Sequence, residues 1–325
     1  MTAEVATTAS LADVGGWRAV LGALTQRRDL SAAEAGAALS DILEGQATSA
    51  QIAAFCVGLR SKGETVEEMT GLLRALLDHA VPVVLDDIDA VDTCGTGGDR
   101  SGTINVSSMA ALVLAGAGAP VCKHGNRAVS SACGSADVLE ALGVNIELGP
   151  RAVAACVERA GIGFCLAPRF HSALRHAGPT RRELGIPTVF NFLGPLANPA
   201  RVRRQVLGVS DPRMADTMAG VLQAQGAERA MVVYGHDGLD ELSTTTTSTV
   251  IELRDGAVRT YTVDPAEVGI EPAPISALRG GDATTNAEVA HRVLDGQPGP
   301  HRDIVLLNAA AGAVAAGLAD DVGEG

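Results

Sequence analysis

The sequence is poor in aromatic residues and in basic residues. The first shortage excludes a core built from aromatic side chains, and the second argues against a surface that binds nucleic acids broadly. Of its 325 residues, 46% are hydrophobic but only 2% are aromatic, so the core must be built mainly from alanine, valine, leucine and isoleucine. The 25 basic side chains against 38 acidic ones give a formal net charge of −13. This balance argues against broad nucleic-acid binding, which needs a basic surface to displace counterions. It leaves room for a local basic pocket.

The sequence also lacks the patterns of secreted, membrane and zinc proteins. Its six cysteines form no C-x-x-C pair and no metal-ligand spacing. The N-terminus has no basic region followed by an apolar run, and no segment of membrane-spanning length is free of charges and helix breakers. We therefore expect a cytoplasmic protein with reduced thiols. The length suffices for one large domain or two ordinary ones.

The N-terminal part of the chain predicts helices alone. Ser31 to Glu34 and Thr65 to Glu68 each have the S/T-x-x-E pattern of a capping box, which satisfies free N–H groups at a helix start. Apolar residues at helical spacing follow each box. We assign residues 1–88 to a helical domain whose amphipathic helices bury one stripe against each other.

From residue 89 onwards, short apolar strands alternate with helices. The expected strands are 89–93, 120–123, 144–148, 163–166, 205–209 and 230–234, followed by a hairpin of 250–253 and 258–263. This alternation predicts an α/β fold with a central, mostly parallel sheet. Residues 170–198 interrupt the pattern with helical sequence punctuated by proline and glycine, which we interpret as a return to the helical domain. The predicted α/β domain is then 89–169 with 199–325, joined to the helical domain by hinge segments.

A glycine-rich loop follows the first predicted strand. It reads Gly95-Thr96-Gly97-Gly98-Asp99, which has neither the Walker spacing nor the G-x-G-x-x-G fingerprint. A plain turn is the alternative interpretation. Thr103, Asn105 and Ser107 follow at a predicted helix start, where hydroxyls and free N–H groups suit an anion. Together these residues indicate a site for an anionic group.

A second glycine-containing segment, Lys123-His124-Gly125-Asn126-Arg127, follows the strand at 120–123. The alternative is a solvated basic turn, the usual environment of a Lys and Arg pair. Here an apolar strand precedes the segment, and small residues and hydroxyls that include Ser131 follow it, so an anion site is favoured. The two segments together predict a site for a polyphosphorylated substrate.

Two further groups are candidates for ligand binding. Asp240 and Glu241 follow the strand at 230–234, and although adjacent carboxylates are most often surface charge, α/β proteins bind ligands where strands end. Oxygen ligands there favour Mg²⁺ over zinc. Arg181 is either part of a solvated helix face, paired with Glu183, or a fork that binds a carboxylate.

These motifs occur in the order found in the anthranilate phosphoribosyltransferase family, which the chain resembles from about Leu21 to Leu318. The segments that carry the resemblance are Gly95–Asp99, Asn105–Ser108, Lys123–Arg127, Gly134–Gly143, Phe190–Pro199 and Gly238–Leu242. The resemblance implies transfer of a phosphoribosyl group from phosphoribosyl pyrophosphate to the amine of anthranilate in tryptophan biosynthesis. It also implies Mg²⁺ as cofactor and a homodimer formed through the helical domain. Family members continue into a further helical segment after residues 308–318, whereas this sequence ends at Gly325.

The resemblance assigns roles residue by residue. The residues implied to bind phosphoribosyl pyrophosphate are Gly95, Gly97, Gly98, Asp99, Thr103, Asn105, Ser107, Lys123 and Ser131. Those implied to contact anthranilate are Gly95, His124, Asn126 and Arg181, and those implied to hold metal are Ser107, Asp240 and Glu241. No acid or base catalyst is assigned, because an aromatic amine is neutral at physiological pH and can attack without first losing a proton.

Two other functions are compatible with the fold that the resemblance implies. A pyrimidine-nucleoside phosphorylase would attack a nucleoside with phosphate, and the intact segments 123–127 and 238–242 speak against it. A non-catalytic, nucleic-acid-binding relative would have a basic surface and would have lost the metal carboxylates, and this sequence has neither property. A transferase that serves a specialised pathway would have the same motifs as a housekeeping enzyme.

Overall fold

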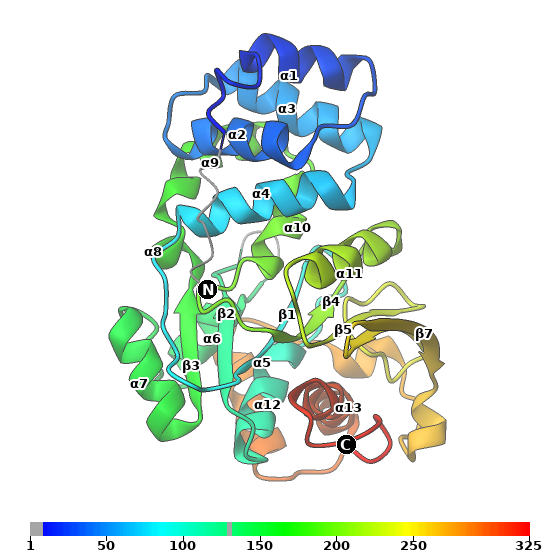
Figure 1. Cartoon of the computed structure of the whole chain (residues 1–325). Coiled ribbons are helices and arrows are strands. Elements are labelled where there is room, and N and C mark those ends of the chain that lie inside the picture. The colour runs from blue at the N-terminus through cyan, green and yellow to red at the C-terminus, as the bar shows by residue number, and fades with distance from the viewer. Residues whose placement is uncertain (1–8, 129–131) are drawn as a thin grey trace. The chain divides into compact units, whose positions relative to one another are not determined.

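The computed structural model describes residues 9–128 and 132–325. Their contacts divide into two compact units, and Figure 1 draws the chain with most of its helices and strands labelled. Among the described residues, the first unit contains 9–81 together with 171–197, and the second contains 82–128, 132–170 and 198–325. The chain therefore leaves the first unit, forms part of the second, returns for 171–197 and then completes the second.

The first unit is all-helical, as the sequence predicts. Its α-helices are α1 (Gly16–Thr25), α2 (Ala32–Leu43), α3 (Ser49–Lys62), α4 (Val66–Asp78), α9 (Gly178–Leu184) and α10 (Val189–Leu196). Both predicted capping boxes are confirmed, at the starts of α2 and α4. Helices α2 and α4 approach closely because Gly71 has no side chain, and a Cβ there would lie 2.1 Å from the carbonyl oxygen of Ala32.

The second unit is an α/β domain built on seven strands. The strands are β1 (Val91–Gly95), β2 (Val121–Gly125), β3 (Ile162–Leu166), β4 (Arg204–Gly208), β5 (Arg229–Gly235), β6 (Ser248–Arg254) and β7 (Ala257–Val263). They form one sheet in the order β3-β2-β1-β4-β5-β6-β7. The first five positions in that order are parallel, and the β6–β7 hairpin adds two antiparallel strands. The predicted fold class is confirmed.

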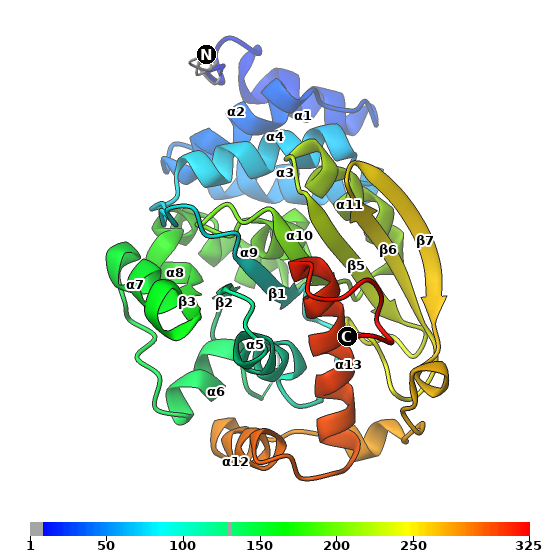
Figure 2. The same cartoon turned by 60° about the horizontal axis from the view of Figure 1, so that its bottom comes forward.

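Helices cover both faces of this sheet. They are α5 (Val106–Gly116), α6 (Ser135–Ala141), α7 (Pro150–Ala160), α8 (Ala167–Phe170), α11 (Ala215–Ala224), α12 (Ala283–Leu294) and α13 (Pro300–Ala316). Figure 2 shows α5 and α13 packed side by side against the sheet, and both contact β1. Their core consists of small and branched aliphatic residues, among them Val91, Ala111, Val206 and Ala311. The scarcity of aromatic residues is thus met by close helix–sheet packing.

One predicted strand is wrong. Residues 144–148 alternate apolar and polar side chains, but within the described parts of the chain they join no strand of the sheet. Only Ile146 is buried, in a small cluster with residues of α6 and β3, whereas Val144 is exposed. The segment connects α6 to α7, so the apolar alternation here reflects a single buried anchor in a loop.

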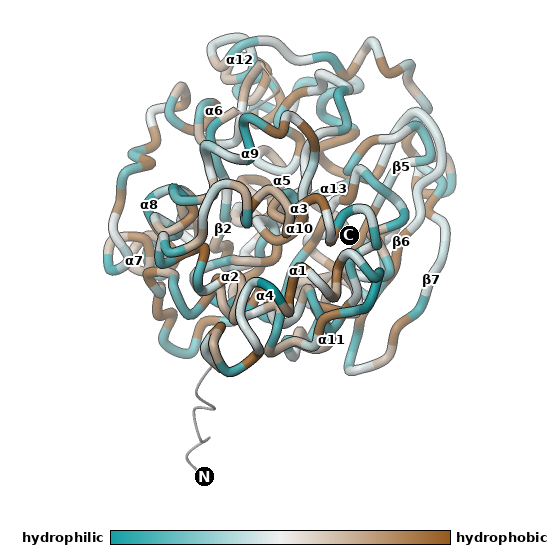
Figure 3. The backbone as a smooth tube through the Cα atoms, turned by 90° about the horizontal axis from the view of Figure 1, so that it is seen from above, coloured by the Kyte–Doolittle hydropathy of each residue, from teal (hydrophilic) through white to brown (hydrophobic). Residues whose placement is uncertain are grey.

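Apolar residues are distributed along the chain in short stretches, as the hydropathy colours of Figure 3 show. In the described residues, no helix is both long enough and apolar enough to cross a membrane.

Candidate active site

The parallel strands bring the predicted segments to one edge of the sheet. The glycine loop follows β1, the segment 123–127 contains the end of β2, and the loop with Asp240 follows β5. Because these strands are parallel, their carboxyl ends meet at the same edge. The strand order changes direction between β1 and β4, and ligands of open α/β sheets bind where this occurs.

The glycine loop is held by a residue that the sequence analysis did not predict. Gly97 and Gly98 have φ angles of 64° and 83°, a left-handed conformation that glycine adopts at little cost. Ser210, just beyond β4, donates its hydroxyl to the Gly97 carbonyl at 2.7 Å, and its N–H donates to the Thr96 hydroxyl at 3.0 Å. The loop conformation therefore depends on a serine that is far away in the sequence.

Asp240 lies against the glycine loop. Its carboxylate Oδ2 accepts a hydrogen bond from the Gly97 N–H at 2.7 Å, and the residue is only 8% exposed. A Cβ on Gly95 would lie 2.4 Å from that oxygen, and a Cβ on Gly208 would lie 1.7 Å from the Asp240 carbonyl oxygen. Gly95 and Gly208 are paired across β1 and β4. Their lack of side chains makes the space that Asp240 occupies.

Glu241 completes a group of neighbouring carboxylates. Burial raises the pKa of Asp240 to about 6, and the charge of Asp99 adds to this effect. Burial followed by the charge of Asp240 raises the pKa of Glu241 well above its usual value. A hydrogen bond from the backbone of Ser107, in the first turn of α5, and the positive charge of Lys123 act in the opposite direction. The two carboxylates thus each bind a backbone donor, one in the glycine loop and one at the start of α5.

Lys123 is a buried cation under this group. It is 2% exposed, and its Nζ donates to the Thr93 carbonyl and lies 3.4 Å from the Ser107 hydroxyl. Asp92, which is fully buried, lies close enough for Lys123 to counteract the burial that raises the Asp92 pKa. Lys123 is therefore placed to balance carboxylates and to orient Ser107.

His124 and its neighbours are positioned through Asp92. The backbone N–H of His124 donates to the Asp92 carboxylate at 3.1 Å, and Asn198 Nδ2 donates to the same carboxylate at 2.9 Å. Asn198 Nδ2 also donates to the Cys122 carbonyl at 2.8 Å. Asp92 and Asn198 were not predicted as site residues, yet they fix the end of β2.

The remainder of the second segment is more exposed. Asn126 is exposed, and its backbone N–H donates to the Ser135 hydroxyl at 3.1 Å. Arg127 pairs with Asp137 at 3.0 Å and with Glu140 at 2.8 Å, so its charge is compensated beside its own loop. Ser131, a predicted phosphate-side residue, lies outside the described residues.

The start of α5 has an asparagine that is held from two sides. Asn105 Nδ2 donates to the Cys133 carbonyl at 3.2 Å, and its Oδ1 accepts from Asn286 Nδ2 at 2.8 Å. Just before it, Thr103 pairs with Arg279 in an antiparallel bridge. Thr103, Asn105 and Ser107 are thus brought to the same edge as the glycine loop.

The carboxylates fit the chemistry of Mg²⁺. Across residues 9–128 and 132–325, no three His, Cys, Asp or Glu side chains form a complete metal site by themselves. The charge of Asp99 nevertheless raises the pKa of Asp240, and the charges of Asp240 and Asp99 raise the pKa of Glu241, as expected of neighbouring oxygen donors that need a cation. Mg²⁺ commonly takes one or two protein carboxylates, with the other ligands from phosphate and water. This donor set is compatible with such a site.

Arg181 belongs to the helical unit, where it stacks on an aromatic ring. Its guanidinium lies 5.1 Å from the centre of the Phe190 ring, and burial lowers its pKa. Among the residues that the structure describes, it has no carboxylate partner, so the alternative in which Arg181 pairs with Glu183 is not found. A partly dehydrated cation of this kind suits a carboxylate ligand.

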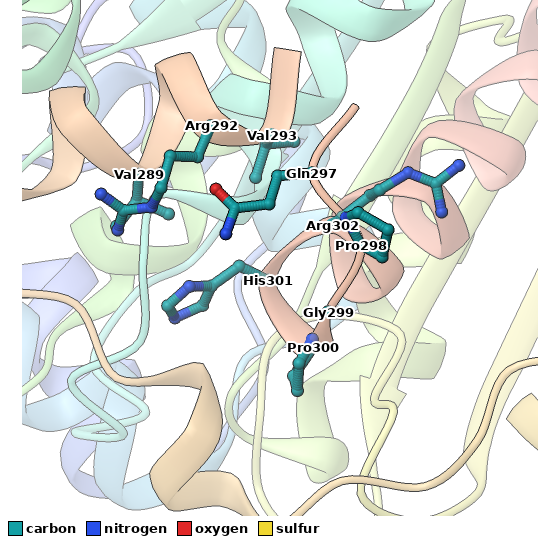
Figure 4. Close-up of a pocket in the computed structure, with 9 residues that line it drawn as sticks. All are labelled: Val289, Arg292, Val293, Gln297, Pro298, Gly299, Pro300, His301 and Arg302. Atoms are coloured by element: carbon teal, nitrogen blue, oxygen red, sulfur yellow. The ribbon is translucent and has the colours of Figure 1, made fainter. Parts of the chain in front are cut away.

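A small cavity of about 130 Å³ lies elsewhere in the second unit, between the end of α12 and the start of α13. Figure 4 shows Gln297 and His301 in this cavity, with Arg292 beside them. None of its lining residues belongs to the predicted site.

Comparison with known proteins identifies the class to which this fold and site belong. Residues 87–325 match the α/β domain of the glycosyl transferase family, and residues 18–80 match the helical bundle domain of the glycosyl transferase family. The chain belongs to this family.

Relatives within the family are anthranilate phosphoribosyltransferases, in agreement with the resemblance found in the sequence. The protein of that name from Rhodococcus jostii is 59% identical over 295 residues, which are 91% of this chain and 81% of the relative. The crystal structure of the Thermus thermophilus enzyme is 42% identical with a TM-score of 0.89, covering 94% of this chain and 91% of its own. The Saccharomyces cerevisiae enzyme in complex with PRPP and Mg is 28% identical with a TM-score of 0.86, covering 95% and 90%.

Proposed function

We propose that this chain transfers the phosphoribosyl group of phosphoribosyl pyrophosphate to the amine of anthranilate, a step of tryptophan biosynthesis. The products are N-(5-phosphoribosyl)anthranilate and pyrophosphate. The similarity to enzymes of this name over nine-tenths of the chain supports the activity. In the structure, the observation that carries it is the placement of Asp240 and Glu241 against backbone donors of the glycine loop and of α5.

The reaction needs charge stabilisation more than proton transfer. The bond from the anomeric carbon to the diphosphate oxygen breaks, and a bond from that carbon to the amine nitrogen forms. Negative charge grows on the departing diphosphate, which backbone N–H groups and a helix N-terminus can stabilise. The amine is neutral before it attacks, and once the new bond has formed its nitrogen gives up a proton to water. The absence of an assigned base is consistent with this chemistry.

Asp240, Glu241 and Ser107 are proposed to hold Mg²⁺. When bound, the ion neutralises diphosphate charge and so makes the diphosphate a better leaving group. Lys123 stabilises this group of residues, because its buried ammonium balances carboxylate charge and contacts the Ser107 hydroxyl. The proposed residues for phosphoribosyl pyrophosphate remain Gly95, Gly97, Gly98, Asp99, Thr103, Asn105, Ser107, Lys123 and Ser131.

Gly95, His124, Asn126 and Arg181 are proposed to contact anthranilate. The surroundings of Arg181 support this most directly, because it is partly buried, stacked on Phe190 and without a carboxylate partner in the described part of its unit. A guanidinium fork matches the carboxylate of the acceptor.

We further propose that the chain forms a homodimer through the helical unit and works in the cytoplasm. Between α1 and α3 the helical unit has a groove lined partly by apolar and small residues, which are Leu21, Leu24, Ala54 and Gly58. Sedimentation equilibrium measures the mass directly, and a single-chain mass at micromolar concentration would rule out the dimer.

Anthranilate fluorescence tests the activity. We expect fluorescence to fall when phosphoribosyl pyrophosphate is added with Mg²⁺ and to persist when EDTA replaces Mg²⁺. A folded sample, verified by circular dichroism, that consumes no anthranilate under either condition would refute the proposed function. The phosphorylase alternative is tested separately, by incubating the protein with a pyrimidine nucleoside and phosphate and measuring release of the free base by chromatography.

A further inference from the structure

Asn286 of α12 joins three separate segments of the second unit. It is 1% exposed, its Oδ1 accepts from the Gly281 N–H at 2.8 Å, and its Nδ2 donates to Asn105 Oδ1 at 2.8 Å. Asn105 in turn donates to the Cys133 carbonyl at 3.2 Å. A buried side chain with satisfied polar groups fixes the orientation of its partners, because an unmade bond there is costly.

The segment before Asn286 supports the same part of the site. The backbone N–H of Ile104 donates to the Leu278 carbonyl at 3.1 Å, and the N–H of Gly280 donates to the Gly102 carbonyl at 2.9 Å. Gly280 must be small, since a Cβ there would lie 2.6 Å from Asn286 Oδ1. Residues 278–286 therefore hold the chain between the glycine loop and α5. Figure 2 places α12 on the same side of the unit as α5, α6 and α13.

The hydrogen bond from Asn286 prevents the Asn105 side chain from capping helix α5. Asn105 occupies the N-cap position of α5, where an asparagine normally accepts a hydrogen bond from an N–H of the first turn. Within the described residues its side chain makes no such cap bond, because its Oδ1 is directed to Asn286. The backbone of Ser107 is instead hydrogen-bonded to the carboxylate of Glu241. The first-turn donor of α5 is thereby kept from the Asn105 side chain, and in the structure it binds a carboxylate of the site.

We infer that Asn286 is a positioning residue for phosphoribosyl pyrophosphate, because it holds Asn105 away from the capping position and so keeps the start of α5 open to phosphate. This inference rests on the proposed function and extends it to a residue that lies outside every motif of the site. Without Asn286, the Asn105 side chain is free to turn back, to cap α5 and to compete with the substrate for the same N–H groups.

The test combines Asn286→Ala with a control on the same helix. Val293→Ala removes a buried side chain of α12 that is 7% exposed and belongs to a purely apolar cluster. We expect Asn286→Ala to raise the KM for phosphoribosyl pyrophosphate about tenfold, the equivalent of one lost hydrogen bond, while the KM for anthranilate stays within about twofold. The control should lower thermal stability to a similar extent and leave both KM values within about twofold.

Asn286→Asp keeps the test valid if the alanine variant folds poorly. It has nearly the same shape and can still accept from Gly281, but it cannot donate to Asn105, so the same rise in KM is expected. Binding is also measured without turnover, as the increase in unfolding temperature on adding phosphoribosyl pyrophosphate and Mg²⁺. This increase should be smaller in both Asn286 variants than in the wild type and the control.

A double-mutant cycle separates positioning from general destabilisation. In an Asn105→Ala background, Asn286→Ala should cause no further rise in the KM for phosphoribosyl pyrophosphate, because its effect passes through Asn105. Additive effects, an unchanged KM in the single variants, or an equal rise in Val293→Ala would each overturn the inference. An inactive wild-type protein would instead refute the proposed function, so the two failures are distinguishable.

Discussion

The carboxylate of Asp240 accepts a hydrogen bond of 2.7 Å from the backbone N–H of Gly97. A protein anion therefore lies on a donor that the glycine loop would otherwise offer to a phosphate. Glu241 has the same relation to the backbone of Ser107 at the start of α5. Under the proposed function, substrate and carboxylates would compete for these donors, and a cation that draws the carboxylates toward itself would favour the substrate.

Asp240→Asn should separate stability from activity. The pKa of Asp240 is raised from 3.8 to about 6 in the folded protein, so the folded state binds the proton more tightly than the unfolded state. Its contribution to stability is present below pH 3.8 and is lost as the pH rises through 6. Without Mg²⁺ at pH 7.5, we expect the variant to gain roughly 2–3 kcal/mol in free energy of unfolding relative to the wild type.

Urea denaturation of both proteins in EDTA from pH 4 to pH 8 checks this expectation. The gain of Asp240→Asn over the wild type should grow between pH 4 and pH 6.5 and level off above it. In the activity assay with Mg²⁺, the same variant should lose about a hundredfold or more in kcat. A variant that is both less stable and fully active would contradict the assignment of Asp240.

Adding Mg²⁺ alone should stabilise the wild type. A cation relieves the repulsion among Asp99, Asp240 and Glu241, and a ligand that binds only the folded state raises the unfolding temperature. We expect a rise that saturates at millimolar Mg²⁺ by differential scanning fluorimetry. The double variant Asp240→Asn with Glu241→Gln should show no rise and little turnover, while its circular dichroism spectrum stays that of the wild type.

Gly208→Ala should destabilise the protein without any substrate present. The added methyl group would lie 1.7 Å from the Asp240 carbonyl oxygen, so the loop with Asp240 must move, at a cost of about 2–4 kcal/mol. Gly116→Ala is the matched control, since Gly116 ends α5 and, beyond its chain neighbours and the backbone of its own helix, no heavy atom of the described residues lies within 4 Å of the added Cβ. The control should be neutral or stabilising by about 0.5–1 kcal/mol. Chemical denaturation of both variants measures the difference.

Arg181→Ala should weaken the binding of anthranilate and leave the binding of phosphoribosyl pyrophosphate unchanged. We expect the KM for anthranilate to rise at least about tenfold, because a charge-assisted bidentate contact is lost, while the KM for phosphoribosyl pyrophosphate stays near that of the wild type. Arg181→Lys retains the charge but not the planar fork, and it should restore only part of the loss. An unchanged KM for anthranilate in both variants would remove Arg181 from the acceptor site.

Asn308→Ala should weaken the loop that contains Asp240 and Glu241. The amide of Asn308, on α13, accepts from the Leu242 N–H and donates to the Leu242 carbonyl, both at 2.9 Å, and the residue is 3% exposed. Removing it leaves both backbone groups of Leu242 buried without this partner, a loss of about 2–3 kcal/mol. The exposed Asn145 is the control, and Asn145→Ala should change the free energy of unfolding by less than about 0.5 kcal/mol.

Most helices and strands of this fold can be predicted from the sequence, because each depends on residues that lie close together along the chain. The capping boxes at Ser31 and Thr65 need only a spacing of three residues, and the strand that leads to Gly95 needs only a short apolar run. The strand predicted at 144–148 is wrong for the same reason, since alternation shows an apolar anchor but not whether a neighbouring strand is available to pair with it.

The site is predictable only where its residues lie in motifs. Asp240 and the glycine loop carry recognisable patterns, but their mutual contact spans 143 residues of sequence. Asn286, Asn308 and Ser210 lie in ordinary helix or loop sequence, and nothing local distinguishes them from solvated polar residues. Their roles come from the tertiary fold, which places a single amide or hydroxyl opposite an otherwise unpaired backbone group or site side chain.

Gly95 and Gly208 carry a consequence for reading other genomes. The space left by their missing side chains matters only while Asp240 occupies it, so the two glycines and the aspartate constrain one another sterically. A related protein without the carboxylate of Asp240 would no longer need glycine at positions 95 and 208, and it could carry alanine or serine there. Residues other than glycine at these two positions would then identify related proteins that keep the fold but have lost the enzymatic activity that needs the aspartate.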